Sequence, residues 1–308
     1  MSGNSTVAYA LESAYNDGTA ADPAYVIPGS DVTVENLTIE NYLTRVRKPD
    51  SVIADRSVAQ QLEGALSVSF NLSTGDFHDL LFDDTNGSGD QVFGTGHVPS
   101  AEWYMGLEFA DSVSSTTTVE RQVQGWVATE ATIAYTTSEI VRVTLTGPYA
   151  TEDKNTTITP DTLTGATDEA PFHGSTFSID SSTPWSASLN SAELSLSNLA
   201  RLVRGTSREP SDAIRATPEV QLTADADIRT ADTLSRAYDG TTTATSPADE
   251  IGGVSGAVSF ETAAGTVADY SLGALRPNDY DWQDLVSSDA TASESVTFNV
   301  DGSFAQTA

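Results

Sequence analysis

Three blocks of the sequence recur in the same order roughly 156 residues further along the chain, and this repeat restricts the possible folds most strongly. The first block aligns Leu37, Ile39, Asn41, Val46 and Arg47 with Leu194, Leu196, Asn198, Val203 and Arg204. The second aligns Val58, Glu63, Leu66, Leu72, Phe82 and Asp83 with Ile214, Glu219, Leu222, Ile228, Tyr238 and Asp239. The third aligns Ser138, Glu139, Val141 and Gly147 with Ser293, Glu294, Val296 and Gly302. The repeat predicts two homologous domains, residues 1–147 (with an N-terminal arm over 1–20) and 170–308, joined by a linker over 148–169.

Alternation of apolar and polar residues predicts that most of the chain is β-strand. Leu66, Val68, Phe70 and Leu72 alternate with Ser67, Ser69 and Asn71, which gives one apolar face. Similar patterns cover residues 32–43, 103–109, 131–145, 189–196, 220–228, 254–260 and 296–304. Helical spacing after capping Ser or Thr residues occurs only over 76–83 and 231–238. Each repeat therefore contains a long strand, a basic loop, a second strand, a short helix and a closing strand pair.

The charge balance excludes several classes of protein. With 44 Asp and Glu against 14 Lys and Arg, the formal net charge is −30, so a basic surface that grips nucleic acid is excluded. The sequence contains no Cys, which excludes disulfides, thiol nucleophiles and cysteine zinc sites. No apolar run approaches the roughly 18 residues of a membrane span, and residues 1–10 lack the pattern of a signal peptide, so we expect no membrane partner.

The acidic residues are spread along the chain, and Lys48 and Lys154 are its two lysines. This composition is typical of a protein that works in multimolar salt, where charge repulsion is screened and carboxylates keep the surface hydrated. An ordinary acidic protein is the alternative.

Eight of the 14 basic residues lie in two equivalent loops. They are Arg45, Arg47, Lys48 and Arg56 in the first loop, and Arg201, Arg204, Arg208 and Arg215 in the second. One interpretation is a pair of solvated hairpin tips. The other is a pair of positive prongs that dock on the acidic face of a neighbouring copy of the chain.

This pattern resembles the tail tube proteins of long-tailed viruses. The likeness includes residues 7–19, the strand over 64–72 that leads into the helix over 77–82, the Gly125-Trp126-Val127 segment and the strand pair over 133–147. It covers nearly the whole chain. With the acidic, lysine-poor composition, it implies a siphovirus- or myovirus-like virus of a halophilic archaeon.

The resemblance implies a mainly β fold with two tandem tail-tube-like β-sandwich or barrel domains, each with one short α-helix. Members of the family form rings of six tube domains whose strands join in one ring-shaped β-barrel. A doubled chain then implies a homotrimer, favoured over a hexamer, that makes a pseudo-hexameric ring. The basic loops named above would stack the rings into a tube.

The resemblance also implies partners and a location. Double-stranded DNA would pass through the tube during ejection without specific binding, and the other partners would be tape-measure, terminator and baseplate proteins. The protein would be assembled in the host cytoplasm and located in the virion tail.

If the strands line a channel, their alternation predicts which residues face the lumen. These are Gln61, Glu63, Ser67, Ser69, Asn71, Thr217, Glu219, Gln221, Thr223, Asp225 and Asp227. Such a lining is polar and net acidic, so it would let DNA pass without adhesion. The alternative is the solvent face of a β-sandwich.

No sequence pattern predicts catalysis, and we expect neither an enzyme nor a cofactor nor a metal. His78, His97 and His173 are far apart, and His78 is expected on the exposed face of its helix. Residues 84–90 imitate the start of a calcium loop, but Thr95 replaces the required Glu, so a polar turn is expected, with a cation site as the alternative. The alternative functions are an extracellular β-domain of a haloarchaeon, such as an adhesin or a surface-layer or pilus-type binding module, and a β-sandwich hydrolase.

Overall fold

The fold is taken from a computed structural model that describes residues 2–18, 25–112, 115–154, 163, 165, 168–180, 183–185, 188–283 and 291–307. Over these residues the chain is mainly β, as the alternating pattern predicts. The described helical elements are one α-helix, α1 (Asp232–Asp239), and two 3-10 turns, η1 (Asp76–Leu80) and η2 (Phe172–Gly174).

The strands divide between the two halves of the chain. The first half contains β1 (Ser2–Leu11), β2 (Ser30–Glu40), β3 (Leu43–Val46), β4 (Arg56–Ala59), β5 (Glu63–Asn71), β6 (Asp84–Thr85), β7 (Gln91–Val92), β8 (Ala101–Ser112), β9 (Ser115–Trp126), β10 (Glu130–Thr136), β11 (Arg142–Tyr149) and β12 (Thr151–Lys154). The second half contains β13 (Ser175–Ile179), β14 (Thr183–Pro184), β15 (Leu189–Ser197), β16 (Ala200–Arg204), β17 (Pro210–Arg215), β18 (Glu219–Asp227), β19 (Val254–Thr262), β20 (Gly265–Gln283) and β21 (Ser293–Gln306).

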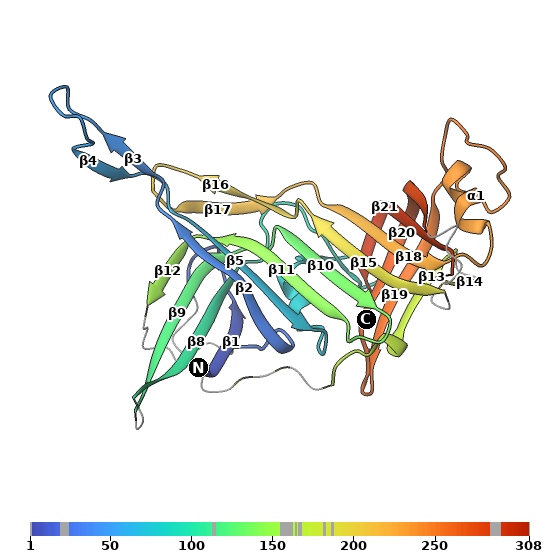
Figure 1. The fold of residues 1–308 in the computed structure, drawn as a ribbon, viewed down its shortest axis with the longest axis horizontal. Coiled ribbons are helices and arrows are strands. Elements are labelled where there is room, and N and C mark those ends of the chain that lie inside the picture. The colour runs from blue at the N-terminus through green and yellow to red at the C-terminus, as the bar shows by residue number, and fades with distance from the viewer. Residues whose placement is uncertain are drawn as a thin grey trace.

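One large antiparallel sheet runs through both halves of the chain (Figure 1). Its strand order is β14-β13-β19-β20-β21-β18-β15-β10-β11-β5-β2, and the short strands β6 and β7 attach at β21. A second sheet, in the order β1-β8-β9-β12, packs beneath β2, β5 and β11. The pairs β3–β4 and β16–β17 form two separate hairpins, which we call the first and the second hairpin.

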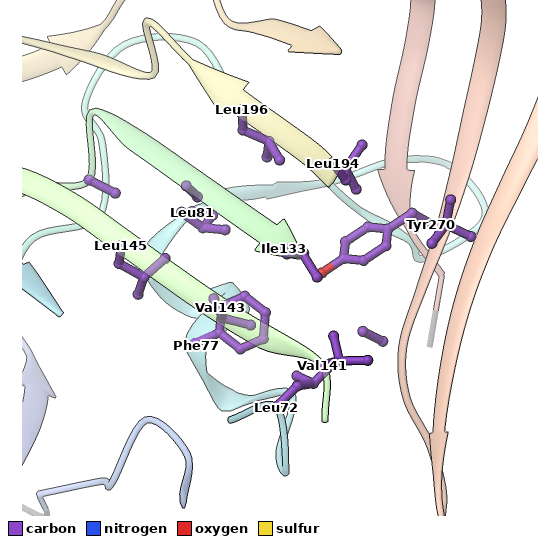
Figure 2. Packing of buried hydrophobic residues seen from close by; sticks show 14 of the residues in the cluster. Leu72, Phe77, Leu81, Ile133, Val141, Val143, Leu145, Leu194, Leu196 and Tyr270 are labelled. Atoms are coloured by element: carbon purple, nitrogen blue, oxygen red, sulfur yellow. The ribbon is translucent and has the colours of Figure 1, made fainter. Parts of the chain in front are cut away.

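The core lies on the apolar face of the large sheet. Leu66, Val68, Phe70 and Leu72 are fully buried, as the alternation in β5 predicts. The aromatic ring of Phe70 packs edge-on against Phe77 of η1, with the ring centroids 5.7 Å apart. Figure 2 shows how apolar side chains from β10, β11 and β15 gather with η1 around Tyr270 of β20. A single apolar cluster therefore joins the two halves of the chain.

The helix predicted over 76–83 is shorter, because its regular part is the 3-10 turn η1. The expectation that His78 is exposed is wrong, because its side chain is 2% exposed. Its Nδ1 atom lies 2.7 Å from the carbonyl oxygen of Gly75, and its Nε2 atom lies 2.6 Å from the hydroxyl oxygen of Tyr270. Because β20 covers η1, the face of the turn that a local pattern assigns to solvent is buried.

The segments predicted as an arm and a linker contain strands. Residues 2–11 form β1, which pairs with β8 along the second sheet. Residues 148 and 149 end β11, and residues 151–154 form β12, which pairs with β9. The remaining residues of the predicted linker lie largely outside the described residues.

Candidate functional site: basic hairpins and sheet edges

Polar side chains on one face of the large sheet form hydrogen bonds from strand to strand. On β5, Ser67 lies 2.8 Å from Thr146, and Ser69 accepts a hydrogen bond from Arg142 at 2.7 Å. On β18, Thr223 lies 3.2 Å from Thr297, with both oxygens hydroxyls. Further bonds on this face join Gln221 to Asn299, Ser191 to Asp225, and Asn190 to Asp227. The face predicted to line a lumen is thus a hydrogen-bonded polar surface.

The residues predicted to face a lumen lie on two strands of the large sheet, β5 and β18, or just before them. Glu63, Ser67, Ser69 and Asn71 lie on β5, which Gln61 precedes. Glu219, Gln221, Thr223, Asp225 and Asp227 lie on β18, which Thr217 precedes. Arg142 is a cation on this face, where it also approaches Asp31 at 3.5 Å and Asn71 at 3.2 Å.

The pairing of β15 with β10 joins two four-strand runs within the sheet. One run is β20-β21-β18-β15 and the other is β10-β11-β5-β2. At the junction, Leu194 lies opposite Ile133 and Leu196 lies opposite Ala131. These apolar side chains are buried. The junction is therefore a closed contact between strands that lie far apart in the sequence.

The two runs leave two strand edges open among the residues that the structure describes. β2 pairs with β5 on one side only, and Ile39 on this edge is 47% exposed. β20 pairs with β19 only as far as Leu275, so residues 276–283 have β21 as their one described strand partner. Trp282 in this segment is also exposed. Open edges of this length can accept another strand.

The second hairpin lies against the residues that flank the first hairpin, Asn41 and 60–63, which we call the root of that hairpin. The Arg204 guanidinium donates to the Leu62 carbonyl at 3.2 Å and pairs with the Glu63 carboxylate at 3.4 Å. Arg208 donates to the Asn41 side chain at 2.8 Å and to the Gln60 carbonyl at 3.3 Å. The Leu62 amide in turn donates to the Arg208 carbonyl at 3.0 Å.

The base of the second hairpin is buried on the first half of the chain. Ala200 and Ala213 pack on Val127 in a small apolar cluster. Arg215 pairs with the Asp83 carboxylate, donates to the Leu81 carbonyl at 3.1 Å, and lies over the Phe93 ring at 5.3 Å. The second hairpin is therefore held by contacts within the chain at its base and through Arg204 and Arg208. Arg201, the remaining basic residue predicted in this loop, is exposed on β16.

The first hairpin extends beyond the rest of the molecule, at the upper left of Figure 1. Lys48 pairs with Asp55 of the same hairpin at 2.9 Å. Within the described part of the chain, no carboxylate lies at ion-pair distance from Arg45, Arg47 or Arg56. Leu43 at its base is 60% exposed, and Val52 at its tip is 95% exposed. Its apolar and cationic groups thus lack the contacts that the second hairpin makes.

The described residues do not form an evident chemical site. They include no group of three His, Asp or Glu side chains close enough to hold a metal ion. In the turn over 84–90, the Asn86 amide bonds to Asp90 at 2.8 Å, and Asn86 accepts from the Ser88 amide, so polar groups of the turn bind one another. The Nδ1 atom of His97 lies 3.1 Å from the carboxylate of Asp212, which is on the second hairpin. None of the helices that the structure describes has the length and apolar composition for a membrane span.

Comparison with known families identifies the class of protein. The family described as phage tail tube protein matches residues 2–302. The chain belongs to this family. No curated protein gives a significant match to the sequence.

Family membership makes the chain a structural tail tube protein and a component of the virion, and does not favour the adhesin or hydrolase alternatives. Tail tube proteins assemble into a tube and associate with other tail proteins, so contacts between copies are the relevant chemistry here. The two open strand edges and the first hairpin are the features of this tail tube protein that offer such contacts. The sequence pointed to the hairpins through their clustered cations, but the β15–β10 junction has no local signal. The one signal in the sequence is that the apolar residues Ile39 and Leu196 occupy aligned positions, which indicates that each would be covered by a neighbouring strand.

Proposed function

We propose that this chain is the major tail tube protein of a siphovirus- or myovirus-like virus of a halophilic archaeon. In this proposal, three copies close a ring, rings stack into a tube, and viral DNA passes through it during ejection. The observation that carries the proposal is the β15–β10 junction, because it is a contact between two units that can be repeated at the open edges of the sheet.

The two four-strand runs correspond to one another in strand order and in sequence. β5 and β18 carry the aligned residues Leu66 and Leu222, and β11 and β21 carry the block that ends in Gly147 and Gly302. β2 then corresponds to β15, and the last part of β20 corresponds to β10. On this basis we treat the chain as two related units, the first within residues 1–147 and the second within 170–308.

The correspondence specifies how the next contact would form. β15 of the second unit pairs with β10 of the first, so β2 of one copy would pair with residues 276–283 of the next. Leu194 lies opposite Ile133 in the junction. The corresponding residues are Leu37 on β2 and Pro277 on β20, so these would lie opposite each other between copies. Ile39, exposed in the single chain, lies two residues further along β2 and would be covered at the end of this paired segment.

Head-to-tail contacts of this kind close into a ring when the rotation between units divides a full turn without any rise along the axis, and otherwise they give an open filament. Closure covers both open edges of the two runs, which would otherwise be free to pair with other strands. Six units, as in the rings implied by the resemblance, correspond to three copies of this chain. The alternative of six chains per ring would place twelve units around the barrel.

The polar face of the sheet suits the inside of such a ring. It carries the acidic side chains of Glu63, Glu219, Asp225 and Asp227, and its hydroxyl and amide groups bond to one another. Phosphates would find few cations there, so DNA would slide without specific binding. The net charge of −30 and the low lysine content support a host that lives in concentrated salt.

The first hairpin extends beyond the sheet and the second runs over β10 and β11, and we propose that their exposed basic residues also contribute to ring stacking. Of the eight basic residues predicted for this role, Arg45, Arg47, Lys48, Arg56 and Arg201 are exposed, whereas Arg204, Arg208 and Arg215 are held by contacts within their own chain. The exposed tip of the first hairpin around Val52 would reach furthest toward another ring. Assembly in the host cytoplasm with tape-measure, terminator and baseplate proteins completes the proposal.

Electron microscopy of purified protein in molar salt tests the proposal. Wild-type protein should form rings and tubes on concentration, and Ile39→Asp should remain monomeric with an unchanged circular dichroism spectrum. Ile39 is exposed, so the variant tests assembly rather than folding. Leu107→Asp, a similar change at an exposed position on the second sheet, should assemble like wild type. Monomeric wild-type protein, or tubes formed normally by Ile39→Asp, would overturn the proposal.

A further inference from the structure

The two hairpins have the same chemistry at corresponding positions but different surroundings. Arg204 of the second hairpin pairs with Glu63 at the root of the first. In the aligned sequence, Arg47 corresponds to Arg204 and Glu219 corresponds to Glu63. Both Arg47 and Glu219 lack a charged partner within the described part of the chain, and Glu219 is exposed. The two residues of a second ion pair are therefore present, one in each half of the chain.

We propose that the first hairpin docks laterally on the root of the second hairpin of the partner subunit in the same ring, with Arg47 paired to Glu219 of the partner subunit. The inference rests on the proposed function, because it uses the head-to-tail ring. It differs from ring stacking in direction: the contact joins neighbours around one ring rather than rings along the tube. The second hairpin, docked on the first unit of its own chain, is the template.

Burial at the hairpin bases supports the same contact. Ala200 at the base of the second hairpin is buried on the first unit, whereas the corresponding Leu43 is 60% exposed. The preceding residues, Leu199 and Tyr42, differ in the same way, since Leu199 is fully buried and Tyr42 is exposed. A partner subunit placed at the β2 edge would cover Leu43 and Tyr42 as the first unit covers their counterparts. The hydrophobic contribution of Leu43 then adds to the ion pair.

The direction of the hairpins agrees with the direction of the sheet junction. In Figure 1 the second hairpin runs over β10 and β11 toward the first hairpin, from the unit that donates β15 to the unit that donates β10. The first hairpin extends in the same sense beyond β2, where the next copy would lie. One placement of the partner subunit therefore satisfies both the open strand edge and the hairpin.

The contact of the second hairpin within the chain includes a backbone hydrogen bond that the contact between copies would lack. The Leu62 amide donates to the Arg208 carbonyl, but Pro218 corresponds to Leu62 and has no N–H. The segment that joins the two strands is longer in the first hairpin, residues 47–55 against 205–209. The side chains of Arg47 and Leu43 thus carry more of the contact, and the tip around Val52 extends past it.

A charge exchange tests the contact. Ring formation is measured by sedimentation velocity across a concentration series, in salt at which the wild-type chain is folded. Arg47→Glu should require at least roughly tenfold more protein for half-maximal ring formation, because it places two carboxylates together. The double variant Arg47→Glu with Glu219→Arg should restore ring formation to within about threefold of wild type. Lys154→Glu, the same charge change on the exposed end of β12, should leave it unchanged.

The possible outcomes separate this inference from the proposed function. If wild-type protein forms rings and Arg47→Glu forms them equally well, the lateral docking is wrong while the tube function stands. If Arg47→Glu is impaired and the double variant is not restored, Arg47 does not pair with Glu219 and the inference is overturned. If wild-type protein forms no rings, the proposed function fails and the docking fails with it. Thermal unfolding of each variant confirms that the single chain is folded.

Discussion

The Nε2 atom of His78 lies 2.6 Å from the hydroxyl oxygen of Tyr270, and this hydrogen bond ties η1 of the first half to β20 of the second. Both side chains are buried in the common core. Burial lowers the pKa of His78 to about 4. The neutral imidazole is therefore part of the packing between the two halves of the chain.

We expect the single chain to lose stability as the pH falls from about 6.5 toward 4. In that range the unfolded chain protonates His78 and the folded chain does not, so the free energy of unfolding decreases with falling pH. The full effect of this one group is roughly 3 kcal/mol. Urea unfolding at several pH values should show that His78→Gln has a shallower decrease than wild type. His173→Gln, at an exposed position, serves as the control and should keep the wild-type slope. Equal slopes in His78→Gln and wild type would contradict the assignment.

Gly147 and Gly302 occupy aligned positions, but each is required for a different reason. A Cβ atom on Gly147 would lie 1.8 Å from the Val127 carbonyl oxygen, so the backbone would have to move. Gly302 has open space around it, but its φ of +81° disfavours other residues. We expect Gly302→Ala to cost about 1 kcal/mol of unfolding free energy. Gly147→Ala should cost at least about twice as much, as overpacking does. Chemical denaturation of both variants would reveal the difference, and the reverse order would contradict the packing seen at Gly147.

Removal of the Arg215 side chain should destabilise the single chain far more than removal of the Arg47 side chain. The Arg215 side chain is 6% exposed and pairs with Asp83, so Arg215→Ala leaves a carboxylate without its cation and should destabilise the single chain by about 3 kcal/mol. Arg47→Ala should change that stability by less than about 0.5 kcal/mol, since its side chain extends from the fold. Denaturation of dilute, unassembled protein distinguishes the two. A large loss in Arg47→Ala would mean that the first hairpin is held within the chain.

The number of chains in the ring can be read from covalent cross-linking. The sequence contains no Cys, so Arg47→Cys with Glu219→Cys introduces two defined thiols. A short bis-maleimide should join neighbouring copies and give dimers and trimers on a denaturing gel. A ladder that ends at three chains agrees with the proposed ring, and one that continues to six contradicts it. The two single-cysteine variants are the controls and should not extend beyond dimers.

Local patterns in the sequence predicted the strands and the basic hairpins, because both depend on neighbouring residues. Alternation along β5 identified Leu66 and Phe70 as core positions, and the structure confirms their burial. The position of His78 was not predictable, because its burial depends on β20, which is distant in the sequence. The β15–β10 junction was missed for the same reason: strand pairing between distant segments has no local signature. The start of the predicted linker looked like a connection, yet residues 151–154 pair with β9.

The pairing of β15 with β10 inside one chain has a consequence for how fast and at what concentration a ring can close. Each association of separate molecules loses translational and rotational freedom, at a cost of about 4–15 kcal/mol. A ring of six single-unit chains needs five such encounters before it closes, whereas the proposed ring of three chains needs two. Every second contact is already made when the chain folds. Ring nucleation should then follow a lower power of protein concentration, so that tubes can begin to grow while the subunit is still scarce in the infected cell.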